Sequence, residues 1–322
     1  MRHVLRLVVF TGALLVAEAA AAQNFPTKSI RLIVPFAPGG SSEIVARSVA
    51  QEMSKSLGQT VFVDNKPGGA GTIAMLDLKG AAPDGHTLIL GHVGVLAVNP
   101  YAMSKHPYDV NRDFAPVVLL ARVPTVFVVN SAVPAKNLRE FVALAKSKPG
   151  QLNYSSAGNG SSGHLTFEYL KMVTDTFVVH IPYRGTGPQL TDLLAGRIEA
   201  ASIGGPAVLP HVRSGKLRAI AVGSAERVAA LPDVGTVAEQ GYPGFETSQW
   251  YGLLAPAGTP RAVLDRLAAE ATKALKSSSV TERFAADSAR GVGGTPEQFA
   301  AFIRAEQQRW QDVIKRANIV ID

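Results

Sequence analysis

Short apolar segments that alternate with amphipathic ones constrain the fold of this chain more than any other feature. The segment "SIRLIVPF" (29–36) has the pattern of a buried strand. Four apolar residues then recur every four positions, as they do along one face of a helix: Val45, Val49, Met53 and Leu57. Gly58 fits the residue after the end of that helix, and further strands are predicted at 60–65 and 86–92. This strand–helix–strand order predicts a parallel sheet covered by helices.

The same rhythm starts again in the second part of the chain. "VVLLARVPTVFVVN" (117–130) contains two strand-like runs joined at Pro124, and strands and helices alternate after it. "FETSQWYGLLAPAGTP" (245–260) reads as an extended crossing segment, and two helices are predicted to follow. We therefore expect an α/β protein of two similar domains that face each other across a cleft, with ligands at the carboxyl ends of the strands. The expected boundaries are residues 23–123 plus 247–322 for domain 1 and 124–246 for domain 2.

The first 22 residues have the organisation of a secretory signal peptide. Arg2 and Arg6 give a positive start, and the apolar core "LRLVVFTGALLVA" follows. The small residues at Ala20 and Ala22 fit an A-x-A cleavage site. We expect cleavage after Ala22, so that the mature chain begins at Gln23 and is exported, which in a bacterium means to the periplasm or the medium.

Composition narrows the possible functions. The chain has no cysteine, which excludes a disulfide, a thiol nucleophile and a cysteine-ligated zinc site. The net charge is +7, but lysine and arginine are scattered singly, and we therefore expect no nucleic-acid partner. The seven histidines are not at the spacing of metal ligands, and there is no G-x-S-x-G elbow. These features argue against a metal site and against a serine hydrolase.

A glycine- and serine-rich loop follows the first predicted strand, in "PFAPGGSSEIVAR" (35–47). Its two glycines leave the backbone uncovered, and its two serines offer hydroxyls. Both pairs lie where the first turn of a helix has unpaired N–H groups and a partial positive charge. The loop is therefore predicted to bind an anion. The alternative is a plain helix cap, with Gly40 at the N-cap and Glu43 at N3.

A second loop of this kind, "SSAGNGSSGH" (155–164), also joins a predicted strand to a helix. Gly158, Gly160 and Gly163 match G-x-G-x-x-G, the signature of dinucleotide-binding enzymes. The acid expected at the end of the next strand is absent, but Arg184 suits the 2′-phosphate of NADP, so an NADP-dependent oxidoreductase is the alternative function. Export argues against a soluble cofactor, and a second anion-binding helix terminus fits better.

Two further loops complete the predicted site. "PYRGTGP" (182–188) precedes a helix, and there Tyr183 could cover a ligand while Arg184 could pair with a carboxylate. "GHVGV" (91–95) follows another strand, and His92 could donate a hydrogen bond to a ligand. The alternatives are a packed tyrosine, an arginine that faces solvent and a solvated histidine.

Six motifs together resemble the substrate-binding proteins of tripartite tricarboxylate transporters, also called Bug receptors. They are "RLIVPFAPGGSSEIVAR", "LGQTVFVDNKPGGAGT", "AAPDGHTLILG", "YSSAGNGSSGHL", "HIPYRGTGP" and "WYGLLAPAGTP", and they span the predicted mature chain. The resemblance implies a two-domain periplasmic binding protein fold, type II-like, in which each domain is a mostly parallel sheet flanked by helices. It implies a monomeric, non-enzymatic receptor without cofactor or metal. Such a receptor binds a small organic carboxylate in the interdomain cleft and hands it to the membrane components of a transporter.

The resemblance also implies roles for particular residues. In the family the first loop holds a ligand carboxylate through backbone amides and ordered waters, and that role falls here on Ala37 to Ser42. The roles of the second and third loops fall on Ser156 to Ser161 and on Tyr183 to Thr186. The full expected ligand-binding set is Ala37, Pro38, Gly39, Gly40, Ser41, Ser42, His92, Ser156, Ala157, Gly158, Asn159, Ser161, Tyr183, Arg184, Gly185, Thr186, Ile203 and Gly204.

Two departures from the family bear on the ligand. Members often have Asp after the first loop, where this chain has Glu43, and Asp near the end of the strand at 197–203, where it has Ile203 and then two glycines. Arg47 lies at the favourable i,i+4 spacing from Glu43, which can therefore be engaged on the helix surface. An ammonium group would then lack an acidic partner, and an unpaired buried charge is costly. We predict a mono- or dicarboxylate without an amine, with its body against Ile203 and Tyr183.

Overall fold

The computed structural model describes residues 25–286, 288–317 and 319–321. The predicted signal peptide and its cleavage site lie outside these residues. The strands are β1 (Ile30–Val34), β2 (Val61–Asn65), β3 (Thr87–His92), β4 (Phe114–Asn130), β5 (Asn153–Ser156), β6 (Val179–Pro182), β7 (Ala200–Gly204), β8 (Leu217–Val222), β9 (Ser248–Pro256) and β10 (Arg290–Gly291).

Helices connect most of these strands. The α-helices are α2 (Ser41–Leu57), α3 (Thr72–Lys79), α4 (Asn99–Ala102), α5 (Val110–Asp113), α6 (Leu138–Ser147), α7 (Ser162–Thr174), α8 (Thr186–Leu194), α9 (Gly205–Arg213), α10 (Arg261–Leu275), α11 (Ser278–Ala286) and α12 (Pro296–Ala317). Two short turns are η1 (Gly69–Gly71, 3₁₀) and η2 (Gly94–Val98, π-helical). Among the described residues, no helix is long and apolar enough to cross a membrane.

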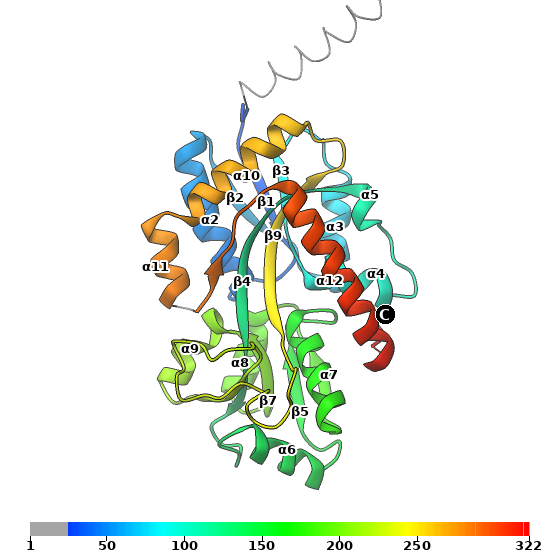
Figure 1. The fold of residues 1–322 in the computed structure, drawn as a ribbon, viewed down its shortest axis with the longest axis vertical. Coiled ribbons are helices and arrows are strands. Elements are labelled where there is room, and N and C mark those ends of the chain that lie inside the picture. The colour runs from blue at the N-terminus through cyan, green and yellow to red at the C-terminus, as the bar shows by residue number, and fades with distance from the viewer. Residues whose placement is uncertain (1–24, 287, 318, 322) are drawn as a thin grey trace, which may run out of the picture.

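Two long strands connect an upper and a lower domain. Both β4 and β9 run from one domain towards the other, side by side (Figure 1). β4 pairs with β9 as far as Pro124, opposite Ser248, and from Thr125 onwards it pairs with β7 and β8. The chain thus crosses between the domains at two adjacent points. One of them is the segment 245–260, which the sequence predicted to be an extended crossing segment.

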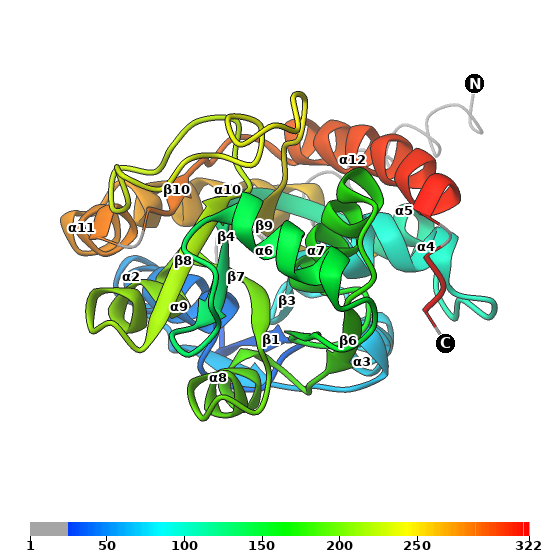
Figure 2. The ribbon, with the colours of Figure 1, turned by 90° about the horizontal axis from the view of Figure 1, so that it is seen from below.

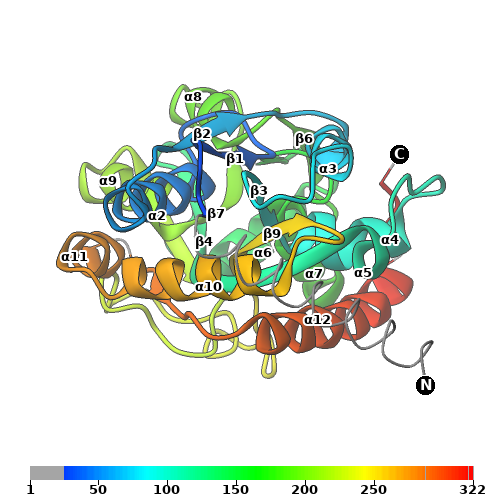
Figure 3. The same ribbon diagram turned by 90° about the horizontal axis from the view of Figure 1, so that it is seen from above.

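Each domain is a sheet between two layers of helices. In the upper domain, α2 and α10 contribute to the apolar core on one face of the sheet, and α3, η2 and α12 to the core on the other. Figure 3 shows α2 and α3 on either side of β1, β2 and β3. In the lower domain, α6 and α7 cover one face and α8 and α9 the other (Figure 2). Apart from Leu165, the upper cores draw on residues 25–123 and 250–321, and the lower cores on 126–245. The upper domain thus corresponds to the proposed domain 1 and the lower domain to the proposed domain 2, and this division supports the proposed boundaries.

The direction of the strands depends on their place in the sheet. β1, β2 and β3 are parallel to one another, as are β5, β6 and β7. The pairs made by the crossing strands β4 and β9 with these sets are antiparallel, so the whole sheet is mixed. The parallel sets are the ones that the strand–helix alternation predicted. Because their strands point towards the interface, their carboxyl ends meet there, and this arrangement positions the site.

The two strand-like runs that were predicted to join at Pro124 form one strand, because β4 is continuous from Phe114 to Asn130. Proline has no N–H to donate to a neighbouring strand. Pro124 lies where β4 leaves β9 and takes up β7 as its partner, so the missing donor falls at a change of partners. The strand therefore passes through the proline without losing a bond from the middle of a ladder.

Candidate functional site

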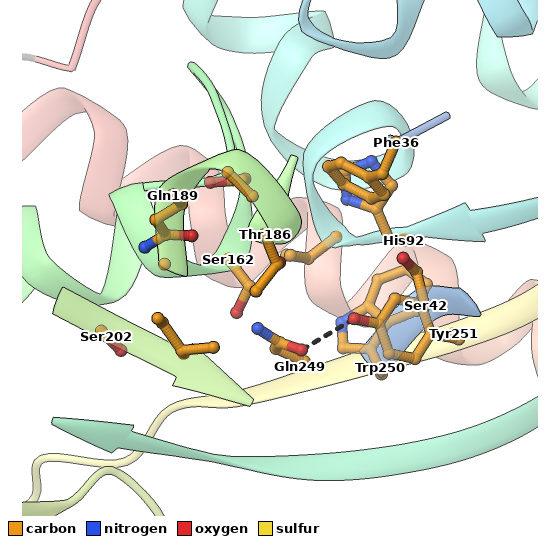
Figure 4. Close-up of a pocket in the computed structure, with 15 residues that line it drawn as sticks. Phe36, Ser42, His92, Ser162, Thr186, Gln189, Ser202, Gln249, Trp250 and Tyr251 are labelled. Carbon is orange, nitrogen blue, oxygen red and sulfur yellow. Dashed lines mark hydrogen bonds between the residues drawn. The ribbon is translucent and has the colours of Figure 1, made fainter. Parts of the chain in front are cut away.

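A small cavity lies between the domains at the carboxyl ends of the parallel strands (Figure 4). Its lining is formed by residues from both domains and from β9: Phe36, Ser42, His92, Val93, Ala157, Ser161, Ser162, Gly163, Thr186, Gln189, Ser202, Ile203, Gln249, Trp250 and Tyr251. The polar groups of the lining are hydroxyl, amide and imidazole groups. None of the fifteen residues is acidic, and none is a lysine or an arginine.

Four helices begin around this cavity. Their N-cap residues are Gly40 for α2, Ser161 for α7, Gly185 for α8 and Gly204 for α9. Only the cap of α7 carries a side-chain hydrogen bond, from the His164 N–H to Ser161 Oγ. The first N–H groups of a helix have no intrahelical partner, and the helix dipole makes this end positive. The glycine caps leave these donors to another partner, which is the arrangement of an anion site.

The first loop uses part of its donor capacity within the chain. The Gly39 N–H donates to Glu43 Oε2 at 2.6 Å, and the Ala37 N–H donates to the Arg184 carbonyl at 3.1 Å. Arg47 forms an ion pair with Glu43 at 2.6 Å, which confirms the predicted i,i+4 engagement of this acid. Glu43 is therefore engaged by both partners at the start of α2, where only 13% of its side chain is exposed.

The second loop is held by two stacked histidines of domain 2. The rings of His164 and His180 lie 4.2 Å apart. His164 Nδ1 accepts from the Gly160 N–H at 3.2 Å, and His180 Nε2 lies 2.6 Å from Ser156 Oγ. Ser156 Oγ in turn accepts from the Gly158 N–H at 3.1 Å. Burial lowers the pKa of His164 to about 4 and that of His180 to about 3, so both rings are neutral and hold the loop through hydrogen bonds.

Gly160 of this loop lies against the other domain. A methyl group on Gly160 would lie 2.7 Å from Asn99 Oδ1 and 3.0 Å from Ile321 Cδ1, both of domain 1. One on Gly94 would collide with the Gly160 carbonyl oxygen. The middle glycine of the G-x-G-x-x-G pattern therefore has a packing role here, because its backbone lies directly against the other domain.

The third loop contacts the first loop of domain 1. Tyr183 donates its hydroxyl to Asp192 at 2.7 Å, and burial together with that carboxylate raises the pKa of Tyr183 to about 12. Arg184 is exposed and touches domain 1 through its backbone carbonyl. Methyl groups on Gly39 and Gly185 would lie 3.1 Å from Gly187 Cα and 2.8 Å from the Ala37 nitrogen. The domains are thus in contact across the cleft.

His92 is buried, contrary to the solvated alternative. Its Nδ1 accepts from the Gly94 N–H at 3.0 Å, so a neutral ring carries its proton on Nε2. Burial lowers the pKa of His92 to about 3, which keeps the ring neutral. Nε2 is buried without a hydrogen-bond partner among the described residues, and the ring packs against Phe36 at 4.6 Å. A buried donor without a partner is costly, which marks it as a group that a ligand would satisfy.

The structure places all but one of the predicted residues in three groups. Six line the cavity: Ser42, His92, Ala157, Ser161, Thr186 and Ile203. Past Phe36, His92 and Ala157 lies a wider outer hollow, and four more line it: Gly158, Asn159, Tyr183 and Arg184. Seven lie where the domains touch: Ala37, Pro38, Gly39, Gly40, Ser41, Gly185 and Gly204. The remaining residue, Ser156, lies inside domain 2 and supports the second loop.

Several lining residues escaped the sequence reasoning, above all the floor of the cavity on β9. Gln249 and Tyr251 share one face of this strand, and the Tyr251 hydroxyl donates to Gln249 Oε1 at 2.7 Å. Gln189 lies one turn into α8, and its Nε2 donates to the Ser155 carbonyl at 2.9 Å. A glutamine and a tyrosine two positions apart in an otherwise apolar strand were the available signal for the floor. Ser202, in the middle of β7, carries a buried hydroxyl without a partner among the described residues.

The cavity offers donors but no metal ligands. Within the described ranges, no group of three or more histidine, aspartate or glutamate residues is arranged to hold a metal ion. The chemistry available is hydrogen bonding to an anion by backbone N–H groups, His92 Nε2 and hydroxyls, supported by four helix dipoles.

Comparisons with known proteins agree with this geometry. Residues 45–319 match the family model of the tripartite tricarboxylate transporter family receptor. Protein BugT of Bordetella pertussis is 39% identical over 308 residues, which cover 95% of this chain and 94% of BugT. The solved periplasmic binding protein BugD is 32% identical with a TM-score of 0.89, over 92% of this chain and 99% of BugD. The structure of R. palustris Rpa4515 with adipate is 34% identical with a TM-score of 0.89, over 92% and 99% of the two chains.

The fold is that of two-domain periplasmic binding proteins, as the six motifs implied. The family model covers most of the chain, and BugT is similar along nearly its whole length. The chain therefore belongs to the tripartite tricarboxylate transporter receptor family.

Proposed function

We propose that this protein is a periplasmic, non-enzymatic receptor that captures a small organic carboxylate between its two domains. It then delivers this ligand to the membrane components of a tripartite tricarboxylate-type transporter. Family membership supports the receptor role, and the adipate in Rpa4515 supports a carboxylate ligand. The proposed site is the cavity together with the loops after β1, β3, β5, β6 and β7.

One observation carries the proposal: four helix N-termini meet at a cavity whose lining has no charged side chain. A carboxylate needs several directed donors, and partial positive charges stabilise it without a full counter-ion. Three of the four caps are glycines without side-chain capping bonds, so the backbone donors face no competition from their own side chains.

The proposed ligand has no amine. The nearest acid of the first loop, Glu43, is already paired with Arg47 and with the Gly39 N–H. The apolar part of the ligand would lie against Ile203 in the cavity. The tyrosine that was expected to cover it, Tyr183, lines the outer hollow instead, where a longer ligand would reach it.

A thermal-shift panel tests the proposal. Succinate, adipate and benzoate are compared with aspartate and phenylalanine, and a carboxylate that binds the folded state raises the melting temperature by mass action. The best ligand is then titrated by calorimetry, and X-ray scattering with and without it follows domain closure. Absence of any shift from the carboxylates would overturn the proposed ligand class. A spectroscopic titration that shows binding of NADPH would instead favour the oxidoreductase alternative.

A further inference from the structure

Gln249 is placed to read the charge of the ligand. It lies on β9, opposite Val123 of β4, at the point where the chain crosses between the domains. Its side chain reaches the floor of the cavity, which receives groups from both domains. A residue at this place touches whatever the domains enclose.

The orientation of its amide is fixed by a neighbouring residue of the cavity lining. The buried Tyr251 donates its hydroxyl to Gln249 Oε1 at 2.7 Å, and burial raises the pKa of Tyr251, so the hydroxyl keeps its proton. With Oε1 engaged in this way, the amide nitrogen points away from Tyr251, towards the side of the cavity where Ser162 lies (Figure 4). Gln249 therefore presents N–H donors to that side of the cavity, while its acceptor is occupied by the Tyr251 hydroxyl.

Close packing adds to this restraint. A methyl group on Gly204 would lie 2.6 Å from Gln249 Oε1 and would collide with Ser41 Oγ. Because Gly204 has no side chain, there is room between the two domains for the amide oxygen of Gln249. The amide is held by a hydrogen bond on one side and by backbone contact on the other.

We propose that Gln249, oriented by Tyr251, is the specificity-determining residue that makes the cavity select an anionic oxygen over an ammonium group. This proposal rests on the proposed carboxylate-binding function. Gln249 is the donor at the floor, and a glutamate in its place would accept the same Tyr251 hydroxyl while offering a negative charge to the ligand. The identity of one atom, nitrogen or oxygen, then sets the preferred charge of the ligand.

Calorimetry on the full mature chain with succinate and aspartate tests this. Wild type is expected to prefer succinate. Gln249→Glu should weaken succinate binding by about 10- to 150-fold, as for loss of a hydrogen bond to a charged group, and should reverse or abolish the preference over aspartate. Tyr251→Phe, which frees the amide to rotate, should reduce the preference with a smaller loss of affinity. Gln298→Glu is the matched control, because it adds the same charge at an exposed residue of α12.

The outcomes separate the two claims. If wild type binds neither acid nor adipate, the proposed function fails and this inference with it. If wild type binds succinate and Gln249→Glu binds it equally well with the preference unchanged, only the role of Gln249 is refuted. Gln249→Met, of similar length but without a donor, covers the case in which the glutamate variant does not fold. Unchanged succinate affinity in that variant also overturns the proposal.

Discussion

A side chain at Gly40 should prevent the domains from closing on a ligand while leaving each domain folded. Gly40 has φ −104° and ψ 173°, a conformation that any residue can adopt, so a substitution there introduces no backbone strain. The positive φ of the loop is at Gly39, with +101°. A methyl group on Gly40 would lie 2.7 Å from Thr186 Oγ1 and 3.0 Å from Thr186 Cβ. Because Thr186 belongs to the other domain, the clash exists only when the domains are in contact.

The size of the effect follows from these distances. The collision partners are a β-branched side chain and its Cβ, which cannot move aside as the end of a long side chain would. Overpacking of this kind costs about 1–3 kcal/mol. Since the cost falls on the closed state alone, Gly40→Ala should weaken binding by about 5- to 150-fold. The larger Gly40→Val should abolish measurable binding.

Calorimetry with the best carboxylate of the panel measures the affinity, and thermal melting without ligand reports on the fold. Gly80→Ala is the control, because Gly80 has a negative φ and a methyl group there would make ordinary contacts. Adding Thr186→Ala to Gly40→Ala removes the 2.7 Å contact and should recover part of the affinity. Wild-type affinity in Gly40→Val would refute the reasoning and would show that the glycine is only a helix cap.

Three further results are expected. His92→Phe removes the unpaired Nε2 donor and should weaken carboxylate binding about 10-fold or more. Because the pKa of His92 is about 3, His92 does not titrate between pH 5 and 8, and its titration should not change the wild-type affinity that calorimetry measures over this range. The pKa values of His164 and His180, about 4 and about 3, lie below the ordinary 6.5, so the folded state binds fewer protons than the unfolded state in this range and stability should fall as pH drops from about 6.5 towards 4. Melting curves should show this fall, and a melting temperature that is constant over the range would contradict it. Mass spectrometry of the exported protein should find Gln23 as the first residue, whereas a retained Met1 would exclude signal cleavage.

The parts of the fold governed by local periodicity were predictable. The helix with apolar residues every four positions is α2, and Gly58 follows it with φ 69° and donates its N–H to the Ser54 carbonyl. Parallel strands also predict where loops gather, which is why six of the expected residues line the cavity. The helix α9 was not predicted, because Pro206 and Pro210 argue against one. Pro206 is tolerated in the first turn, where its missing N–H would have had no partner in any case.

The floor of the site was not predictable by the same reasoning. Gln249 and Tyr251 lie within a strand that the sequence marks as a connection, and nothing local indicates that it runs beneath the cavity. Their position depends on how β4 and β9 cross between the domains, which is a property of the assembled sheet. The burial of His92 is of the same kind, since it arises from the packing of Phe36 and of the loop around Gly94.

The way in which the cavity provides positive charge links binding to closure. An arginine or lysine in the site would hold a carboxylate on one domain even when the cleft is open. Here the donors are divided: domain 1 supplies the start of α2 and His92, and domain 2 supplies the starts of α7, α8 and α9. Each set alone offers weak partial charges in contact with water, and enclosure strengthens them by removing that water. We therefore expect strong affinity only in the closed state, so that opening the domains at a membrane partner would by itself release the ligand.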